Sequence, residues 1–468
     1  MCKPQSTQRI LSFFSATSVN SVAKKLLPHS FRHSPGARTR QTNSIHSYNE
    51  VMRFRIFNQS DIPGKYRSNF INLYLDIAWF GVLSGTAVNF LNVYATRLGA
   101  TSLQVGLLTA TAAIVNLFLA IPAGHWISRQ HTGKAVFWSS ILFRIGYFLW
   151  IPLPWIFSDQ AEIWALILIN FLMAIPLTPL GVGFNALFAE AVPAQYRARV
   201  AGTRNVTFAI AYMLTSLITG FILKNMEFPL GYQVVFAIGA CGAAISSYHL
   251  YHIKPLMEEV PAPPSAPEAD SATNASPSRG VTSALRLDVW SSRFRNVLIA
   301  MFIFHFSHYL SSPLYPIFNV RVLKLNDGHI GNGTALYYLS VLIASTQLGR
   351  IVHRLGNKKV TGWGVAGMAT YPLMLAFAQN VWQFYVLSFI GGFLFAWVNG
   401  SYANYMLENI PPDDRPSHLA WYTIMFNLAV LASSLIGPLV ADWIGLVEAL
   451  IAFGIARILA GLYLLKWG

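Results

Sequence analysis

The sequence contains few charged residues and almost no cysteine. Of its 468 residues, 11% are charged, whereas 54% are hydrophobic and 14% aromatic. An ordinary soluble domain carries roughly 25% charged residues, so this composition excludes a typical soluble globular protein. The two cysteines, Cys2 and Cys241, are too few and too far apart for a disulfide framework or a metal cluster. We therefore expect no metal site.

The sequence also lacks the short motifs of common enzyme classes. It contains no GxxxxGK[ST] loop, no HExxH and no GxSxG, and no soluble domain that could bind ATP. We predict that the protein is not an enzyme and needs no cofactor. If it pumps a solute, it must draw on an ion gradient.

A single basic face is missing as well, although the formal net charge is +15. The lysines and arginines lie in short connectors between hydrophobic runs, which argues against nucleic-acid binding and for a membrane topology signal. Only Arg97, Lys224, Arg321 and Lys324 fall in connectors on one side. Because most basic residues lie on the other side, we place both termini and the central linker in the cytoplasm.

Hydrophobic runs of about 20 residues recur along the chain, and each could cross a hydrocarbon core of about 30 Å as a helix. Barrel strands would instead appear as alternating segments of roughly ten residues. We predict an all-α membrane protein with twelve transmembrane helices in two pseudo-symmetric six-helix halves. The predicted spans are 69–95, 103–128, 135–157, 161–189, 203–224, 231–252, 294–319, 332–352, 357–378, 381–407, 416–441 and 444–467.

The spans divide the chain into four parts. A polar, basic leader covers residues 1–68, an N-terminal half residues 69–252, a Pro-, Ser- and Ala-rich linker residues 253–293, and a C-terminal half residues 294–468. The leader up to residue 51 is either a start-site artefact or plain tail, or a Ser-rich, acid-poor organellar transit peptide. We expect a multi-pass protein, a monomer in the lipid bilayer of the plasma (inner) membrane, or of an organelle if the transit peptide is real.

The two halves repeat each other in sequence. Residues 106 and 331 are both glycine, an offset of 225, and the same offset pairs the ends of the second and eighth spans. An E-x-x-P-x-x-x-R element occurs in equivalent connectors at an offset of 218, followed by a Ser-Leu-Ile match. The matched segments are Gly124–Arg129 with Gly349–Arg354, Glu190–Arg197 with Glu408–Arg415, and Ser216–Ile218 with Ser434–Ile436.

With these basic, glycine-containing turns and its central linker, the chain resembles the major facilitator superfamily over about 400 residues, and most of all its prokaryotic members of unassigned substrate. Ser128 and His353 stand where the family's turn usually has an acid. The resemblance implies parallel repeats and a secondary transporter that moves a small solute by alternating access, with coupling to protons or another ion as one option. Few charges near the midplane favour a neutral, amphipathic or singly charged solute.

Two other functions stay open from the sequence. One is a transporter-like membrane receptor or sensor without flux, although the linker contains no recognisable signalling domain. The other is a multidrug-type exporter, although the G-x-x-x-G-P pattern of many exporters is missing from residues 207–223.

Asp76 and Arg144 are the first candidates for chemistry, because a charge at the bilayer centre costs at least about 2.5–3.5 kcal/mol. Both lie roughly 10–15 Å deep from the cytoplasmic side at 1.5 Å per residue, so they could pair. Asp76 could accept a proton or cation, and Arg144 could tune the pKa of Asp76. The alternative is a structural ion pair inside the first half.

His305 and His308 share one helix face and could titrate near neutral pH or bind substrate, or simply bond a neighbouring helix. Further polar candidates lie on helices that line the cavity in the resembled fold: Asn89, Asn170, Trp397, Asn399 and Asn404.

The duplicated connectors predict a cytoplasmic gate, since a clamp between rocking halves needs charges at symmetry-related places. The alternative is exposed ion pairs of little energetic value. The candidate gate residues are Gly124, Arg129, Glu190, Arg197, Gly349, Arg354, Glu408 and Arg415.

Overall fold

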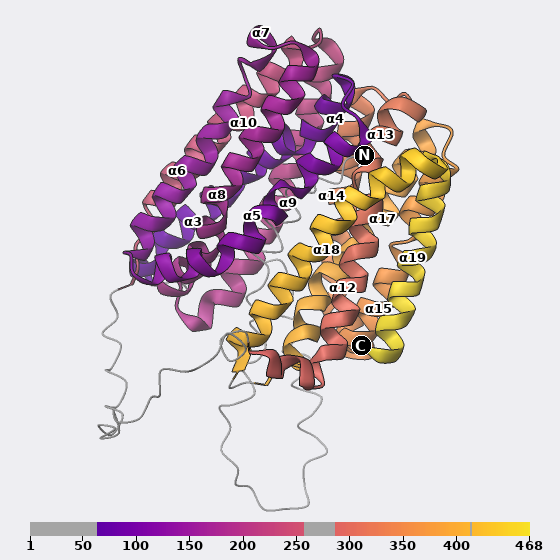
Figure 1. The fold of residues 1–468 in the computed structure, drawn as a ribbon. Helices are drawn as coiled ribbons and strands as arrows, with labels where there is room; N and C mark the ends of the chain where they lie inside the picture. The colour runs from indigo at the N-terminus through magenta and orange to yellow at the C-terminus, as the bar shows by residue number, and fades with distance from the viewer. Residues whose placement is uncertain (1–62, 257–285, 412–413) are drawn as a thin grey trace, which may run out of the picture.

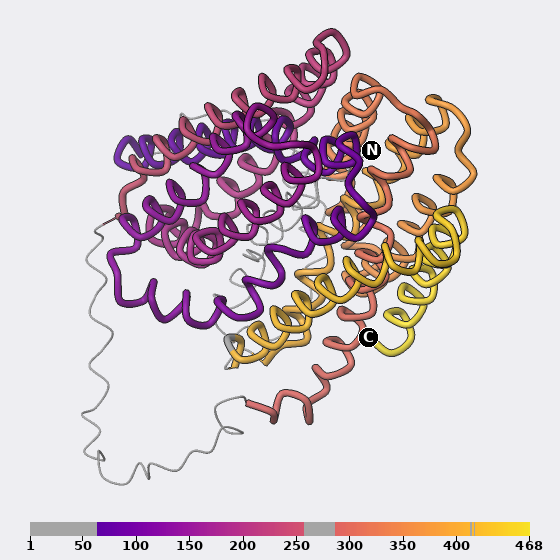
Figure 2. Tube along the Cα trace, turned by 45° about the horizontal axis from the view of Figure 1, so that its top comes forward, coloured from indigo at the N-terminus to yellow at the C-terminus, as the bar shows by residue number. Residues whose placement is uncertain are grey.

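The computed structural model describes residues 63–256, 286–411 and 414–468. The transit-peptide region and most of the predicted leader and linker lie outside these residues. Figure 1 shows two groups of helices, one from each half of the chain, and Figure 2 shows them as separate groups from a second direction. The helical architecture confirms the predicted fold class.

The N-terminal half starts with one long helix made of α3 (Gly64–Leu83), a π-helical turn (Ser84–Val88) and α4 (Asn89–Arg97). The remaining helices of this half are α5 (Ser102–Ser128), α6 (Thr132–Leu149), the short α7 (Leu153–Ile156), α8 (Asp159–Ala191), α9 (Ala194–Asn225) and α10 (Leu230–Tyr251).

The C-terminal half repeats this order. After a 3₁₀ turn (Leu287–Ser291), its first long helix is again built from two α segments and a π-helical turn, namely α12 (Phe294–Ser311), α13 (Leu314–Ile317) and Phe318–Val322. The remaining helices are α14 (Asp327–Leu355), α15 (Asn357–Gly367), α16 (Thr370–Ala376), α17 (Val381–Glu408), α18 (Arg415–Ile444) and α19 (Leu446–Trp467).

Within the described residues, 10 helices are long and apolar enough to cross a membrane. The other two predicted spans, 135–157 and 357–378, correspond to α6 and to the pair α15 and α16. These segments occupy equivalent places, because α6 packs against α8 and α10, and α15 packs against α17 and α19. The chain therefore has the predicted two six-helix halves.

Several details of the predicted spans were wrong. The span 203–224 starts nine residues too late, because α9 begins at Ala194, directly after its N-cap Pro193. The spans 135–157 and 357–378 are not single helices, because α6 ends at Leu149 before the short α7, and α15 ends at Gly367 before α16. These errors arose because hydropathy locates an apolar run and not the hydrogen-bonded helix around it.

The halves meet through α5 against α18 and α9 against α14. We call the end where α10 ends and α12 begins the linker side, and the opposite end, where α4 and α13 contact each other, the far side (Figure 1). Gly106 lies against the Ser434 carbonyl, and Gly331 against the Ser216 carbonyl. The repeat found in the sequence is thus a pair of equivalent glycine contacts that brings the halves together near the far side.

Gly331→Val is expected to weaken this contact, because a Cβ at position 331 would lie 2.5 Å from the Ser216 carbonyl oxygen. Overpacking of this kind costs about 1–3 kcal/mol, which thermal unfolding of the purified protein would measure. Gly202→Ala in α9 is the matched control, since a Cβ there meets nothing within 4 Å. Equal stability of the two variants would contradict the close approach of α9 and α14.

Candidate functional site

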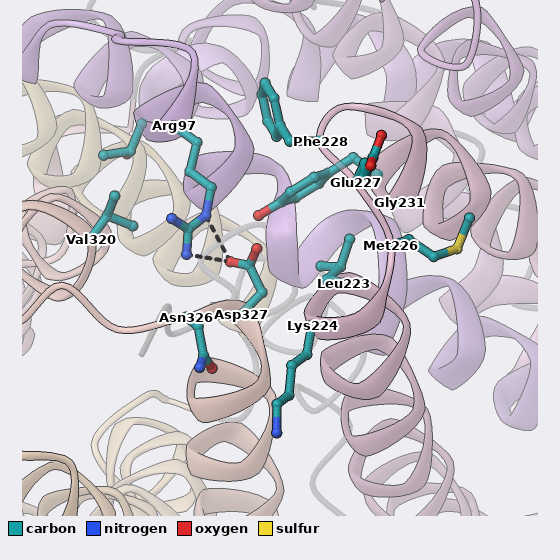
Figure 3. Close-up of a pocket in the computed structure, with 12 residues that line it drawn as sticks. Arg97, Leu223, Lys224, Met226, Glu227, Phe228, Gly231, Val320, Asn326 and Asp327 are labelled. Atoms are coloured by element: carbon teal, nitrogen blue, oxygen red, sulfur yellow. Dashed lines mark hydrogen bonds and ion pairs between the residues drawn. The ribbon is translucent and has the colours of Figure 1, made fainter.

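The halves are tied together by polar contacts on the far side (Figure 3). Arg97 at the end of α4 donates from Nε to Asp327 Oδ1 at 2.9 Å and pairs with the same oxygen through its terminal nitrogen at 2.8 Å. The Arg97 guanidinium also donates to the Leu325 carbonyl at 2.9 Å, and Arg321 donates to the Ala100 carbonyl at 2.5 Å. These bonds cross from one half to the other in both directions.

A second far-side bond joins the other helix pair. Ser102, at the start of α5, donates to Asp442 near the end of α18 at 2.7 Å. Because the two glycine contacts lie just below these bonds, side-chain pairing and close helix packing reinforce one another. The far side is closed by both.

A cavity of about 620 Å³ opens beside the Arg97–Asp327 pair (Figure 3). Its lining includes Lys224, Glu227 and Tyr232 from the first half and Asn326 from the second. The cavity lies on the far side, next to the bonds that join the halves, and is lined by both apolar and charged side chains.

Deeper in the bundle, a polar and aromatic layer also crosses between the halves. Asn89 donates to Thr334 Oγ1 at 3.4 Å and accepts from the Tyr212 hydroxyl at 3.2 Å. The ring of Tyr212 stacks on that of Tyr338, with centroids 4.1 Å apart. Asn89, a predicted substrate residue, is therefore buried at an inter-half contact directly after the π-helical turn.

The predicted gate acids on the linker side are bound within their own halves. Glu190 accepts from Thr132 at 2.9 Å, and Glu408 accepts from Asn357 at 2.8 Å. Thr132 and Asn357 each begin the third helix of their half, so the two bonds are symmetry equivalents. The repeat thus extends to hydrogen bonds that the sequence did not reveal.

The remaining gate candidates are also placed on the linker side. Arg197 donates to the Val192 carbonyl at 3.0 Å and to the Ala189 carbonyl at 2.7 Å, both at the end of α8. Arg129, Gly349 and Arg354 are exposed, and Gly124 and Arg415 are partly exposed. A role for these residues in gating stays a prediction.

Asp76 and Arg144 lie close together inside the first half, as their depth predicted, with Arg144 3.7 Å from Asp76 Oδ1. A third charge joins them, because Arg204 of α9 pairs with Asp76 Oδ2 at 3.3 Å. Arg204 was not among the predicted site residues, because it lies at the edge of a predicted span and was counted with the connectors. Recognising Pro193 as a helix N-cap would have placed it two to three turns inside α9.

His305 and His308 line a small cavity of about 40 Å³ together with Asn399 and Tyr402 of α17 and Phe426 of α18. The His305 Nδ1 atom lies 2.7 Å from the Met301 carbonyl of its own helix. Three of the predicted residues, His305, His308 and Asn399, are therefore neighbours in space. This grouping joins α12 to α17, as substrate binding in the C-terminal half would require.

The other predicted polar residues have local roles. Asn170 of α8 donates to Thr111 Oγ1 of α5 at 2.8 Å, a bond between two helices of one half. Asn404 donates to the Gly400 carbonyl of its own helix at 3.4 Å. The ring centroid of Trp397 lies 5.3 Å from that of Phe393 on the same helix, in a tilted arrangement. These contacts do not bring the three residues into one site.

An exposed ion-pair cluster fixes the chain where it enters the C-terminal half. Arg286 pairs with Asp414 at 2.7 Å and with Asp288 at 2.9 Å. Hydrogen bonds from Ser417 and from Arg286 lower the pKa of Asp414, so its carboxylate stays charged at neutral pH and is protonated only well into the acid range. This cluster positions the start of α18 beside the end of the linker.

The family model described as Major Facilitator Superfamily matches residues 77–326 and 297–467. The cis,cis-muconate transport protein of Acinetobacter baylyi is 23% identical over 251 residues, which are 52% of this chain and 57% of that protein. The chain thus matches little more than half the length of this curated relative.

Two solved structures share the fold at low identity. The D-xylose-proton symporter is 17% identical with a TM-score of 0.63, over 86% of this chain and 97% of that one. A bacterial homologue of the iron transporter ferroportin, in an inward-facing state, is 14% identical with a TM-score of 0.63. The match covers 86% of this chain and 98% of that one. At these identities the likeness establishes the fold alone.

Asp76→Asn is expected to destabilise the protein, because it leaves Arg144 and Arg204 buried without a carboxylate. Removing one partner of a buried ion pair costs about 3–5 kcal/mol, measurable as a lower thermal midpoint. Asp159→Asn, at the exposed first turn of α8, is the matched control and should leave the midpoint nearly unchanged. A wild-type midpoint for Asp76→Asn would argue against an ionised Asp76 in this cluster.

Proposed function

This chain belongs to the major facilitator superfamily, and from that membership we propose that it moves a small solute across the membrane by alternating access. The observation that carries the mechanism is the position of the bonds between the halves. Arg97 with Asp327 and Ser102 with Asp442 join them on the far side, whereas Glu190 and Glu408 on the linker side are bound within their own halves. This asymmetry is what one of two alternating states requires.

We place the linker side on the cytoplasmic face of a plasma membrane, because lysines and arginines concentrate on that side of the chain. In that orientation we infer a state that is closed to the outside by the far-side bonds and open to the cytoplasm. The layer of Asn89, Tyr212 and Tyr338 then lies at the inner end of the closed outer gate. A solute arriving from the cytoplasm would meet this layer at the closed end of its path.

The solute would bind between this layer and the His305 pocket. In that pocket Tyr402 offers an aromatic ring, while Asn399 and the histidines offer hydrogen bonds, which suits a small neutral or singly charged molecule. The similarity to a cis,cis-muconate transport protein adds organic acids to the solutes worth testing. Coupling to protons would use Asp76 or one of the two histidines.

Arg97→Gln is expected to shift the protein towards the outward-open state, because it removes the cation that pairs with Asp327 across the two halves. Losing hydrogen bonds to a charged group costs about 1.5–3 kcal/mol, which changes a two-state population at least about tenfold. Spin labels at Ser128→Cys and His353→Cys, with the native cysteines replaced, would report this shift as a shorter linker-side distance.

The control for this variant is Lys224→Gln, which removes an exposed cation from the same far-side cavity and should leave the distance distribution unchanged. Adding Arg197→Gln and Arg415→Gln to Arg97→Gln should restore the long distance if these arginines clamp the closed cytoplasmic gate. An unchanged distribution in Arg97→Gln would overturn the assignment of Arg97 and Asp327 as the outer gate.

Transport itself is tested in proteoliposomes with an imposed pH gradient, an internal pH dye and a panel of sugars, nucleosides and organic acids. We expect one solute class to drive proton movement in the wild type and in Asp159→Asn. If Asp76 carries the proton, Asp76→Asn abolishes this movement. Solute equilibration without proton movement would contradict proton coupling, and absence of flux for every solute would contradict the transport proposal.

A further inference from the structure

Two cations and one anion are buried together in the N-terminal half. The side chains of Asp76, Arg144 and Arg204 are each 5–7% exposed. The cluster therefore carries one positive charge more than its side chains neutralise. An uncompensated charge in a region of low dielectric costs several kcal/mol, so such a surplus requires a counter-ion or many hydrogen bonds.

Arg204 is the cation that Asp76 neutralises. Its two terminal nitrogens lie 3.4 and 3.3 Å from Asp76 Oδ2, and one of them donates to the Leu73 carbonyl at 2.8 Å. The other carboxylate oxygen, Oδ1, accepts from Ser246 at 2.7 Å. Both oxygens of Asp76 are thus bonded without Arg144.

Arg144 is the cation left over. It lies 3.7 Å from Asp76 Oδ1, beyond ordinary hydrogen-bond distance, and makes one short bond, to Ser247 Oγ at 2.8 Å. Its Nε is buried and has no hydrogen-bond partner among the residues that the structure describes. A guanidinium has five N–H donors, so Arg144 retains unused donors in a dry environment.

Arg457 shows how a buried arginine finds many acceptors among protein atoms, although its Nε, like that of Arg144, has no hydrogen-bond partner among the described residues. It is completely buried in α19, and its terminal nitrogens donate to five oxygens. Three of these oxygens are backbone carbonyls and two are hydroxyls, and all lie within 3.3 Å. Arg144 has no comparable set of acceptors, which makes it the cation that needs an external anion.

A cavity of about 20 Å³ lies among these charges, lined by Asp76, Arg144 and Arg204 together with Phe80, Phe143 and Phe184 and further apolar residues. This volume holds one or two water-sized particles and excludes an organic solute. We propose that the cavity binds one small monovalent anion of the size of chloride, with Arg144 as its principal donor. The anion would neutralise the cluster and stabilise the N-terminal half independently of transport.

The test uses the full chain, purified in detergent and equilibrated in sodium gluconate, an anion too large for the cavity. Chloride then replaces gluconate at constant ionic strength while tryptophan fluorescence follows thermal unfolding. A ligand that binds only the folded state raises its stability with concentration. We expect a saturable rise of a few degrees with chloride, and a similar rise with bromide.

Two variants on one helix make the assignment specific. Arg144→Gln removes the surplus charge and should abolish the chloride-dependent rise, whereas Lys134→Gln, an exposed cation at the start of α6, should retain it. Asp76→Asn increases the surplus and should enlarge the rise. Identical midpoints of the wild type in chloride and gluconate, or an undiminished rise in Arg144→Gln, would overturn the proposal.

If Arg144→Gln does not fold, crystals of the wild type grown in bromide provide the decisive measurement. Anomalous scattering should then place bromide within hydrogen-bond distance of Arg144, and the absence of a peak in this cavity would refute the site. Both measurements detect binding without flux. Their failure therefore leaves the proposed transport function untouched, and a failure of transport leaves the anion site untouched.

Discussion

The structure depends on one constraint, which is that polar groups within a hydrocarbon core must find partners inside the protein. The backbone meets it by forming helices, so the described chain is built of long helices joined by short turns. The side chains meet it differently at each site. Arg457 is surrounded by carbonyl and hydroxyl oxygens, Arg204 faces Asp76, and Arg144 is incompletely paired. These three buried arginines are therefore compensated by different means, and Arg144 only in part.

The repeat provides equivalent contacts in the two halves, as the proposed alternating access of two rigid halves would require. Gly106 and Gly331 let α5 approach α18 and α14 approach α9 at backbone distance near the far side. At the linker side, Glu190 and Glu408 instead tie helices of the same half together. Contacts that hold a half rigid are thus separated from contacts that join the halves.

Much of the fold and part of the candidate site could be predicted from the sequence, because the sequence patterns that indicate them are local or occur twice. The apolar runs gave the helical class, the E-x-x-P-x-x-x-R elements gave the repeat, and equal depth correctly paired Asp76 with Arg144. Arg204 was missed because the helix extends beyond its apolar run. The Arg97–Asp327 pair was not foreseen because Arg97 ends one helix and Asp327 begins another far away in sequence, and no periodic pattern links two helix ends.

The conformational state could not be predicted from the sequence, because under the proposed alternating access one sequence would support two arrangements of its halves. The bonds that join the halves on the far side are weak enough for two such arrangements. Arg97 is 24% exposed and Asp327 is 9% exposed, so their pairing is partly screened by water and can be exchanged for hydration. The Asp76 cluster, by contrast, is almost fully buried, so breaking it would leave a buried charge without its partner. Weaker bonds between the halves than within them would allow the proposed rocking of the halves as units while each remains folded.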